Sequence, residues 1–285
     1  MNKYILSPAQ IEQIQKTLEK VDRIELQKQL DIITPVEYKN GLYFKRDDYY
    51  TVCGVKGGKS RSAYQIINNA LNNNKNIFVT AGSRMSPQCE IVSTICEKLG
   101  LVCHLFMPQG KETSVIKNIC QNKNSTIHFV KAGYNNVIIS YAQKFAEENN
   151  YCYIPFGMEC VENIEITKHQ VQNIPDNVKR IVIPCGSGMS MISVIKGLNY
   201  YRMFDKKVLG VIVGKDPTKT FKRFLQHNLF EIINIDYSFV KSELDYHQTP
   251  KVTTINDVDL DIVYESKCIP FLKKNDLLWI VGKRL

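Results

Sequence analysis

Three short segments of this chain contain residues whose types and spacing could do chemistry together. The first, Val55–Arg61, places Lys59 directly after two glycines and so offers an amine. The second, Cys185–Ser190, is a Gly-Ser-Gly loop that could cradle a phosphate, and the third, Val263–Lys267, contains a carboxylate. An amine, a phosphate cradle and an acidic partner for a heteroaromatic nitrogen are the anchors that pyridoxal phosphate needs from a protein. The sequence therefore predicts this cofactor.

Lys59 can be interpreted in three ways. The run Gly57–Ser60 first suggests a nucleotide P-loop, in which Lys59 would bind phosphate and Ser60 would bind magnesium. The spacing fails by one residue, because Cys53 stands where that loop needs its first glycine and Gly54 follows it. The second interpretation is a Schiff-base amine at the start of a helix, where burial and the helix dipole favour its neutral form. The third is a solvated lysine at a helix start.

The Gly-Ser-Gly loop lies between a strand-like run and a helix-like run. It consists of Gly186, Ser187, Gly188, Met189 and Ser190. Backbone N–H groups here, together with the two serine hydroxyls, could hold a phosphate at the positive end of a helix dipole. A Gly-Ser-Gly sequence is often only a turn, but the strand-loop-helix context favours phosphate binding.

The Val263–Lys267 segment contains two adjacent residues with chemical potential. The Glu265 carboxylate could keep a pyridine nitrogen protonated, so that the ring accepts electrons from a carbanion. The Tyr264 phenol could act as a nucleophile or an acid near the substrate. The alternatives are a solvated surface carboxylate for Glu265 and a core aromatic side chain for Tyr264.

The composition is that of a moderately basic globular protein. The 285 residues carry a formal net charge of +9, dispersed along the chain, which permits an anionic substrate or nucleic acid without requiring either. The nine cysteines form no CxxC pair and no histidine lies at metal-ligand spacing, so we expect reduced thiols and no metal site. No apolar run approaches the ~20 residues that span a bilayer, and residues 1–8 lack the apolar core of a secretion signal. We therefore expect no membrane span and a cytoplasmic location.

Short apolar runs alternate with amphipathic runs along most of the chain. The stretch from Gln10 to Leu30 is expected to be helical. Expected strands are 41–46, 76–80, 101–107, 126–130, 180–183, 208–213 and 277–281, and expected helices are 60–71, 87–99, 114–121, 136–149 and 189–201. Apolar strands that alternate with helices predict mostly parallel sheets covered on both faces.

Several runs of the chain together resemble one enzyme group. They are Thr34-Pro35, Lys45–Asp48, Gly57–Arg61, Thr80–Ser86 and Val263–Lys267. These runs are similar to motifs of the 1-aminocyclopropane-1-carboxylate deaminase and D-cysteine desulfhydrase group of fold-type II pyridoxal-phosphate enzymes, and the likeness extends over most of the chain. The resemblance implies an α/β fold with two open parallel-sheet domains of the tryptophan synthase β-like kind. The expected domains are a smaller inserted domain at residues 53–160 and a larger cofactor-binding domain formed by residues 1–52 and 161–285.

The resemblance also implies which residues would be catalytic. Lys59 would hold the cofactor aldehyde as an imine and would move the Cα proton of the substrate. The loop from Gly186 to Ser190 would bind the cofactor phosphate, and Glu265 would lie beside the ring nitrogen. Tyr264 would lie near the substrate as a second catalytic residue.

Substrate binding is where the chain departs from the group. Ser86 is the expected contact for the substrate α-carboxylate, with Gln88 and the more loosely placed Tyr246 as further substrate contacts. The group usually has asparagine after this serine, but this chain has Pro87, which has no side-chain donor and no backbone N–H. The asparagine that usually precedes the lysine is Gly58 here. The carboxylate pocket must therefore differ from that of the group.

These motifs predict a pyridoxal-phosphate-dependent lyase or deaminase that acts at Cα of an amino acid through Schiff-base and quinonoid intermediates. The resemblance implies a homodimer. An alternative is a decarboxylase or lyase that acts on an amino acid attached to a nucleic-acid base, as in DNA hypermodification. Alternatives from other classes are an ATP-binding protein that uses Gly57–Ser60, and a non-catalytic module of the same fold, which the altered Ser86–Gln88 loop leaves open.

Overall fold

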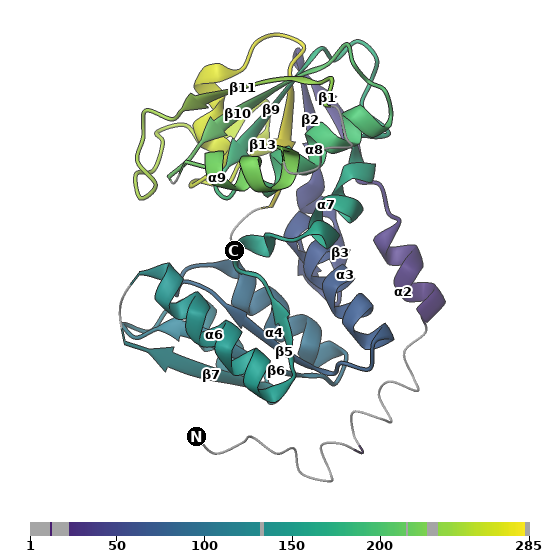
Figure 1. The fold of residues 1–285 in the computed structure, drawn as a ribbon. Coiled ribbons are helices and arrows are strands. Elements are labelled where there is room, and N and C mark those ends of the chain that lie inside the picture. Colours follow the sequence, from purple (N-terminus) through teal and green to yellow (C-terminus); the bar gives the residue numbers. More distant parts are fainter. Residues whose placement is uncertain (1–11, 13–22, 132–133, 215, 227–232, 283–285) are drawn as a thin grey trace. The chain divides into compact units, whose positions relative to one another are not determined.

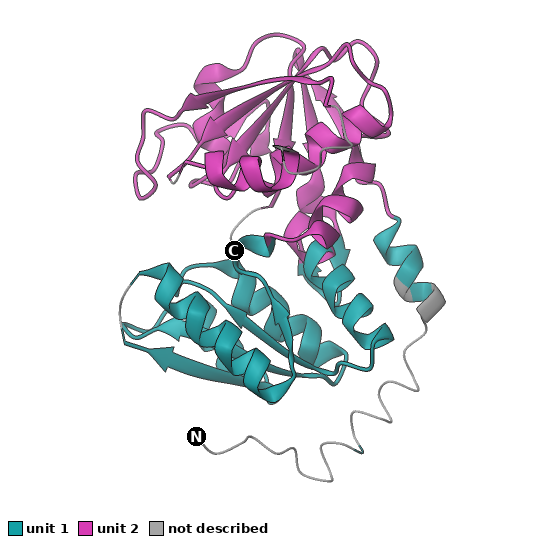
Figure 2. Ribbon diagram, viewed as in Figure 1, with its two compact units in different colours: residues 1–31, 51–55, 62–158 teal, residues 32–50, 56–61, 159–285 magenta. Residues whose placement is uncertain are grey.

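The computed structural model of the chain describes residues 12, 23–131, 134–214, 216–226 and 233–282 (Figure 1). These residues form two compact units, coloured separately in Figure 2. Unit 1 contains the described residues within 1–31, 51–55 and 62–158, and unit 2 contains those within 32–50, 56–61 and 159–285. Each unit has a sheet of its own.

The sheet of unit 2 has six strands. Their order is β1 (Val36–Lys39), β2 (Leu42–Arg46), β14 (Leu277–Ile280), β9 (Arg180–Cys185), β10 (Lys207–Ile212) and β11 (Asp236–Lys241). All neighbours are parallel except β1 and β2, which form an antiparallel hairpin at the sheet edge. The hairpin turns at Asn40 and Gly41, whose φ angles of 46° and 87° are those that a type I′ turn requires.

Both faces of this sheet are buried, as the apolar strands predict. On β14, Leu277 and Trp279 pack with residues of α8 (Met189–Tyr200), whereas Leu278 and Ile280 pack into a second core on the other face. The alternation follows from the two-residue period of a strand. Further helical segments of unit 2 are α7 (Val161–Thr167), α9 (Thr218–Phe221), a π-helical turn (Lys222–Gln226) and 3-10 turns at Asp47–Tyr49, Lys168–Val171 and Glu265–Phe271.

Unit 1 contains a four-stranded parallel sheet. The strand order is β7 (Ser125–Val130), β6 (Val102–Pro108), β5 (Ile77–Ala81) and β8 (Cys152–Ile154). Its helices are α2 (Arg23–Leu30), most of α3 (Gly58–Asn72), α4 (Pro87–Lys98), α5 (Ser114–Cys120) and α6 (Asn135–Asn149), with a 3-10 turn at Phe156–Met158. Ile138, Ala142 and Ala146 of α6 pack against Val79 and Phe106 of the sheet. Two short strand pairs lie outside the main sheets: β3 (Thr51–Val52) with β4 (Val55–Lys56), and, in unit 2, β12 (Thr254–Ile255) with β13 (Val258–Asp259).

The predicted alternation of strands and helices is confirmed, and both main sheets are parallel apart from β1. The predicted helix from Gln10 to Leu30 is described only at α2, and most of the remainder lies outside the described residues. β1, β8 and β11 were not expected, because their sequences lack long apolar runs. The units also divide the chain differently from the expected domains, since residues 56–61 belong to unit 2 and the described residues within 1–31 belong to unit 1.

All nine cysteines are free thiols, as expected. Among the described residues, no group of three or more potential ligands could hold a metal ion. No helix in the described part of the chain is long and apolar enough to cross a membrane.

Candidate active site

Lys59 lies in the first turn of α3, and backbone hydrogen bonds within unit 2 fix this turn. The Gly57 N–H donates to the Tyr50 carbonyl at 2.9 Å, and the Gly58 N–H donates to the Val281 carbonyl at 2.8 Å. Gly57 has a φ of 96°, and a Cβ there would lie 3.2 Å from the Val281 oxygen. The two glycines therefore let the chain pass close to the end of β14, with Lys59 half-buried directly after them.

The structure gives Ser60 a local role. Its hydroxyl donates to the Gly57 carbonyl at 2.6 Å, and the residue is fully buried. A P-loop serine must instead present its oxygen to magnesium. The geometry therefore argues against the nucleotide interpretation of this segment.

A buried ion pair also stabilises the first turn of α3. The sequence analysis assigned no role to this pair. Arg61 NH2 lies 2.6 Å from Asp47 Oδ1, and both side chains are buried. Thr34 Oγ1 donates to the same Asp47 oxygen at 3.3 Å, and the guanidinium lies over the Tyr50 ring at 4.2 Å. A Cβ added to Gly58 would overlap Asp47 Oδ2. Asp47 therefore packs against the residue that precedes Lys59, which explains glycine at this position. In the sequence, Asp47 and Arg61 stand out only because they belong to the runs Lys45–Asp48 and Gly57–Arg61, which resemble motifs of the enzyme group.

The Gly-Ser-Gly loop connects β9 to α8 at the carboxyl edge of the sheet. β2, β14 and β9 are parallel, so Asp47, Gly186 and Val281 all follow strand ends at this edge, where α/β folds bind ligands. Gly188 caps α8 with a φ of 87° and no side-chain hydrogen bond, and a Cβ there would lie 2.7 Å from Phe221. The first N–H groups of a helix have no partner within the helix. Those of α8 are therefore available to a phosphate, together with the half-buried hydroxyls of Ser187 and Ser190.

Tyr264 and Tyr246 lie next to this loop. A Cβ added to Gly186 would lie 3.0 Å from Cε1 of Tyr264 and 3.2 Å from its phenol oxygen. Tyr246 meets Tyr264 edge to face, with 6.0 Å between ring centroids, and its ring lies against Gly214, which follows β10. The structure thus brings both predicted tyrosines to the carboxyl edge of the unit 2 sheet.

Glu265 is held at the end of β14. Its Oε1 accepts a hydrogen bond from the Val281 N–H at 2.8 Å, and the residue is 1% exposed. Burial, together with the nearby Asp261 carboxylate, raises the pKa of the Glu265 carboxyl to about 8. Its Oε2 is buried and has no hydrogen-bond partner among the described residues. Such an atom leaves a carboxyl ready to bind the nitrogen of a pyridine ring, so these residues fit pyridoxal phosphate.

Two further residues shape this segment and were not singled out from the sequence. Asp261 Oδ1 accepts the N–H groups of Val263 at 2.8 Å and Tyr264 at 3.0 Å, which turns the chain just before Glu265. Lys267 is buried, and its amine donates to the carbonyls of Asp245 at 2.7 Å and Tyr246 at 3.1 Å. The role of Asp261 could have been predicted from the sequence, because an aspartate often accepts hydrogen bonds from the backbone N–H groups two or three residues later in a turn.

The predicted substrate contacts Ser86 and Gln88 lie in unit 1, after β5. Ser86 is the N-cap of α4, and its Oγ accepts the Gln88 N–H at 3.4 Å, with Pro87 at the first helical position. The Gln88 side chain is 1% exposed, and its amide nitrogen donates to Thr80 Oγ1 at 2.9 Å and to the Pro155 carbonyl at 2.8 Å.

The carbonyl oxygen of Gln88 accepts the Gly157 N–H at 2.7 Å. The amide therefore uses both N–H groups inside unit 1 and has none to offer a substrate. This geometry gives Gln88 a structural role and leaves Ser86 at the helix start as the candidate for a carboxylate.

Comparisons with known proteins agree with this geometry. Residues 29–250 match the family described as "Pyridoxal-phosphate dependent enzyme". The chain is similar to the O-seryl-dTMP PLP-dependent decarboxylase of Salmonella phage ViI, with 24% identity over an alignment of 202 positions that covers 59% of this chain and 46% of that relative. The matched part thus spans less than half the length of that protein.

Solved structures share the fold. An ACC deaminase homologue aligns with a TM-score of 0.78 at 20% identity, over 97% of this chain and 95% of that chain. The processed form of threonine deaminase isoform 2 from Solanum lycopersicum aligns with a TM-score of 0.63 at 17% identity, over 93% of this chain and 86% of that chain. The predicted two-domain, tryptophan synthase β-like fold is therefore confirmed.

Proposed function

Because this chain belongs to the family of pyridoxal-phosphate-dependent enzymes, whose cofactor is pyridoxal phosphate, we propose that it is a lyase or deaminase that acts at Cα of an amino acid. The observation that carries the proposal is the buried Glu265 carboxyl, whose Oε2 has no hydrogen-bond partner among the described residues. An acid in this position favours chemistry in which negative charge develops at Cα.

Each predicted residue has a distinct task. When bound, the cofactor supplies an electron sink for negative charge at Cα. The N–H groups at the start of α8 would hold its phosphate, and the Glu265 carboxyl would interact with its ring nitrogen. The Lys59 amine would hold the cofactor and would accept the proton from Cα of the substrate. Ser86 binds the substrate carboxylate, and Tyr264 donates a proton near the leaving group.

Borohydride reduction and proton exchange test this assignment. Reduction of the cofactor-loaded protein should fix the cofactor to Lys59, as mapped by peptide mass spectrometry, and Lys59→Ala should remove the label. The wild type should exchange the Cα proton of its amino-acid substrate in D2O, whereas Lys59→Ala should lose this exchange. Lys56→Ala is the matched control, because Lys56 is an exposed lysine on β4. A label on another lysine, or undiminished exchange in Lys59→Ala, would contradict the proposal.

A second candidate function is decarboxylation or elimination of an amino acid that is attached to a nucleotide. The similarity to the phage O-seryl-dTMP decarboxylase favours it, and the altered Ser86–Gln88 loop is compatible with a substrate other than a free amino acid. Release of CO2 from O-seryl-dTMP, without release of ammonia from free amino acids, would support this candidate. Ammonia and a keto acid from a free amino acid would support the first.

The homodimer and the cytoplasmic location stay predictions. The nine free thiols agree with a reducing compartment, and light scattering during size-exclusion chromatography measures the mass of the assembly.

A protein that binds no pyridoxal phosphate but binds ATP with magnesium would instead support the P-loop interpretation. Cofactor binding without turnover of any amino-acid substrate would favour a non-catalytic module.

A further inference from the structure

Arg84 lies in the loop that connects β5 to α4 in unit 1. The loop runs from Gly82 to Ser86 and follows the carboxyl end of β5, so Arg84 lies two residues before the Ser86 cap. Carboxyl ends of parallel strands form the edge of a sheet where ligands bind in α/β folds. Arg84 is therefore in the same loop as the predicted contact for the substrate carboxylate.

Specific contacts fix the position of this arginine. Arg84 NH1 donates to the Lys111 carbonyl at 2.8 Å, and Thr113 Oγ1 donates to the Arg84 carbonyl at 2.7 Å. A Cβ added to Gly110 would overlap Cζ and NH1 of Arg84 and lie 2.8 Å from its Nε. The missing side chain of Gly110 leaves room for the guanidinium against the chain that follows β6. The loops after β5 and β6 therefore hold the side chain between them.

The Arg84 charge is not neutralised by a neighbouring acid. Among the described residues, no carboxylate forms an ion pair with Arg84, and its Nε and NH2 donate to no protein acceptor. The nearest acid along the chain from Gly110, Glu112, lies 3.6 Å from the Lys117 amine, and Lys111 adds a second exposed positive charge beside Arg84. The two loops that follow β5 and β6 thus carry a net positive charge, and the Arg84 guanidinium is held between them with unused hydrogen-bond donors.

We propose that Arg84 binds a phosphate group carried by the amino-acid substrate, and so selects a nucleotide-linked amino acid over a free one. The inference rests on the second candidate of the proposed function. A guanidinium donates two parallel hydrogen bonds to phosphate oxygens, and a held guanidinium loses less conformational freedom on binding. Ser86 then binds the α-carboxylate, and Arg84 binds the phosphate, which a simple amino acid lacks.

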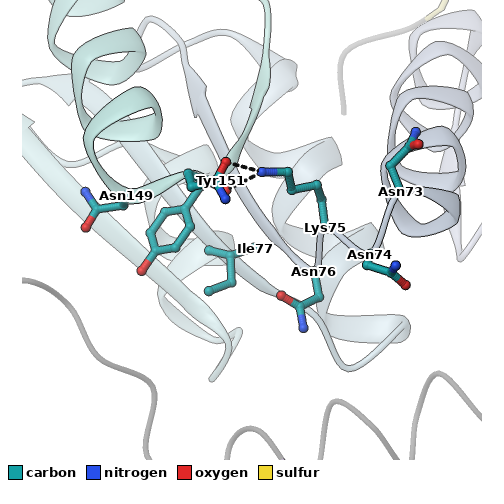
Figure 3. Close-up of a pocket in the computed structure, with 8 residues that line it drawn as sticks. Asn73, Asn74, Lys75, Asn76, Ile77, Asn149 and Tyr151 are labelled. Carbon is teal, nitrogen blue, oxygen red and sulfur yellow. Dashed lines mark hydrogen bonds between the residues drawn. The ribbon is translucent and has the colours of Figure 1, made fainter.

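Unit 1 contains another polar concavity with a cation, at the opposite edge of the same sheet. This pocket of about 260 Å³ is lined mainly by asparagines, with Lys75, Ile77 and Tyr151 (Figure 3). The Lys75 amine donates to the Asn150 carbonyl at 2.8 Å and also to the Asn150 side chain (Figure 3). Because the Lys75 amine already donates to two acceptors of Asn150, it has fewer donors left for a ligand, and the Arg84 loop is the better phosphate site.

Calorimetric titration of the cofactor-loaded protein with dTMP, thymidine and a short oligothymidylate tests the inference. The wild type should bind dTMP more tightly than thymidine, and Arg84→Ala should weaken dTMP binding by about 10–100-fold without changing thymidine binding, since hydrogen bonds to charged groups contribute about 1.5–3 kcal/mol. Arg84→Lys should retain part of the preference, because it keeps the charge but loses the paired donors. A larger loss with dTMP than with the oligothymidylate assigns Arg84 to a nucleotide monoester, and the reverse assigns it to a phosphodiester in DNA.

Two control variants remove a positive charge elsewhere in unit 1. Lys144→Ala changes an exposed lysine on α6 and should leave dTMP binding unchanged, and Lys75→Ala should also leave it unchanged. Loss of dTMP binding in Lys75→Ala but not in Arg84→Ala would overturn the inference and place the nucleotide in the asparagine-lined pocket. Absence of any dTMP preference in the wild type would also overturn it. The second candidate function is judged separately, by release of CO2 from O-seryl-dTMP and by the Lys59 label, so its failure is distinguishable from failure of Arg84 to bind dTMP.

Discussion

The backbone N–H of Val281 donates to Oε1 of Glu265 at 2.8 Å, and the carbonyl of the same residue accepts the N–H of Gly58. The end of β14 therefore joins the acid proposed for the cofactor ring to the turn that carries Lys59. The Glu265 carboxyl and the backbone of the turn that carries Lys59 are thus both held by the Val281 peptide. This arrangement leaves Oε2 of Glu265 available for a ligand.

Glu265→Gln should change how the stability of the cofactor-free protein depends on pH. The unfolded chain releases this proton near pH 4.5, whereas burial keeps it in the folded protein up to about pH 8. Between these values the folded state binds one more proton, so the free energy of unfolding falls as pH rises. Relative to Glu265→Gln, the wild type should therefore lose about 5–10 °C in Tm between about pH 5 and about pH 8.5.

Thermal unfolding of the cofactor-loaded protein completes that test. In the proposed function the ring nitrogen of the cofactor lies beside Glu265 and, when protonated, would stabilise the carboxylate, so cofactor should reduce the difference between wild type and variant at high pH. Equal pH dependence of the two cofactor-free proteins would show that Glu265 is not the buried acid described here.

Gly58→Ala should destabilise the first turn of α3, because its Cβ would overlap Oδ2 of Asp47. Forced overlap in a packed site costs about 1–3 kcal/mol, measurable by urea unfolding. The variant should also show less borohydride labelling of Lys59. Gly282→Ala is the matched control, since its Cβ would meet only the Gly57 Cα at an ordinary 3.6 Å. Equal stabilities of the two variants would contradict the packing seen at Gly58.

Asp47→Ala should be among the most destabilising single substitutions in unit 2. It leaves the buried Arg61 guanidinium without its counter-charge, which costs about 3–5 kcal/mol. Asp47→Asn should cost less, because the amide oxygen still accepts a hydrogen bond from Arg61. Lys144→Ala removes one partner of an exposed pair with Glu148 and should change the free energy of unfolding by no more than about 0.5 kcal/mol.

Tyr264→Phe should separate packing from catalysis. The ring still packs against Gly186 and Tyr246, so the variant should keep its fold and its binding of pyridoxal phosphate. If the phenol transfers a proton, kcat should fall by about 10²–10⁴-fold. Tyr134→Phe, at a tyrosine that is 83% exposed, is the control for loss of a hydroxyl. An unchanged kcat in Tyr264→Phe would assign this tyrosine to packing alone.

The sequence by itself determined the chemistry of the separate segments and the class of fold. Apolar strands such as 180–183 alternate with helices such as 189–201, and burial on both sheet faces follows from that pattern. Residue types alone indicate the chemistry of three segments: a lysine after two glycines, a Gly-Ser-Gly loop between strand and helix, and a Tyr-Glu pair. The polar edge strand β11 was missed because half of its residues face solvent and its sequence lacks an apolar run.

Only the tertiary structure decided how these segments meet. The Val281 peptide links Glu265 to Gly58 through backbone atoms, which every residue possesses, so no residue type announces such a contact. The sequence likewise did not show that Asp47 and Arg61 form a buried pair. Gln88 is a polar residue that usually lies at a surface, yet its amide is buried because Thr80, Pro155 and Gly157 satisfy its hydrogen bonds. Burial and pairing depend on neighbours that the fold brings from distant parts of the chain.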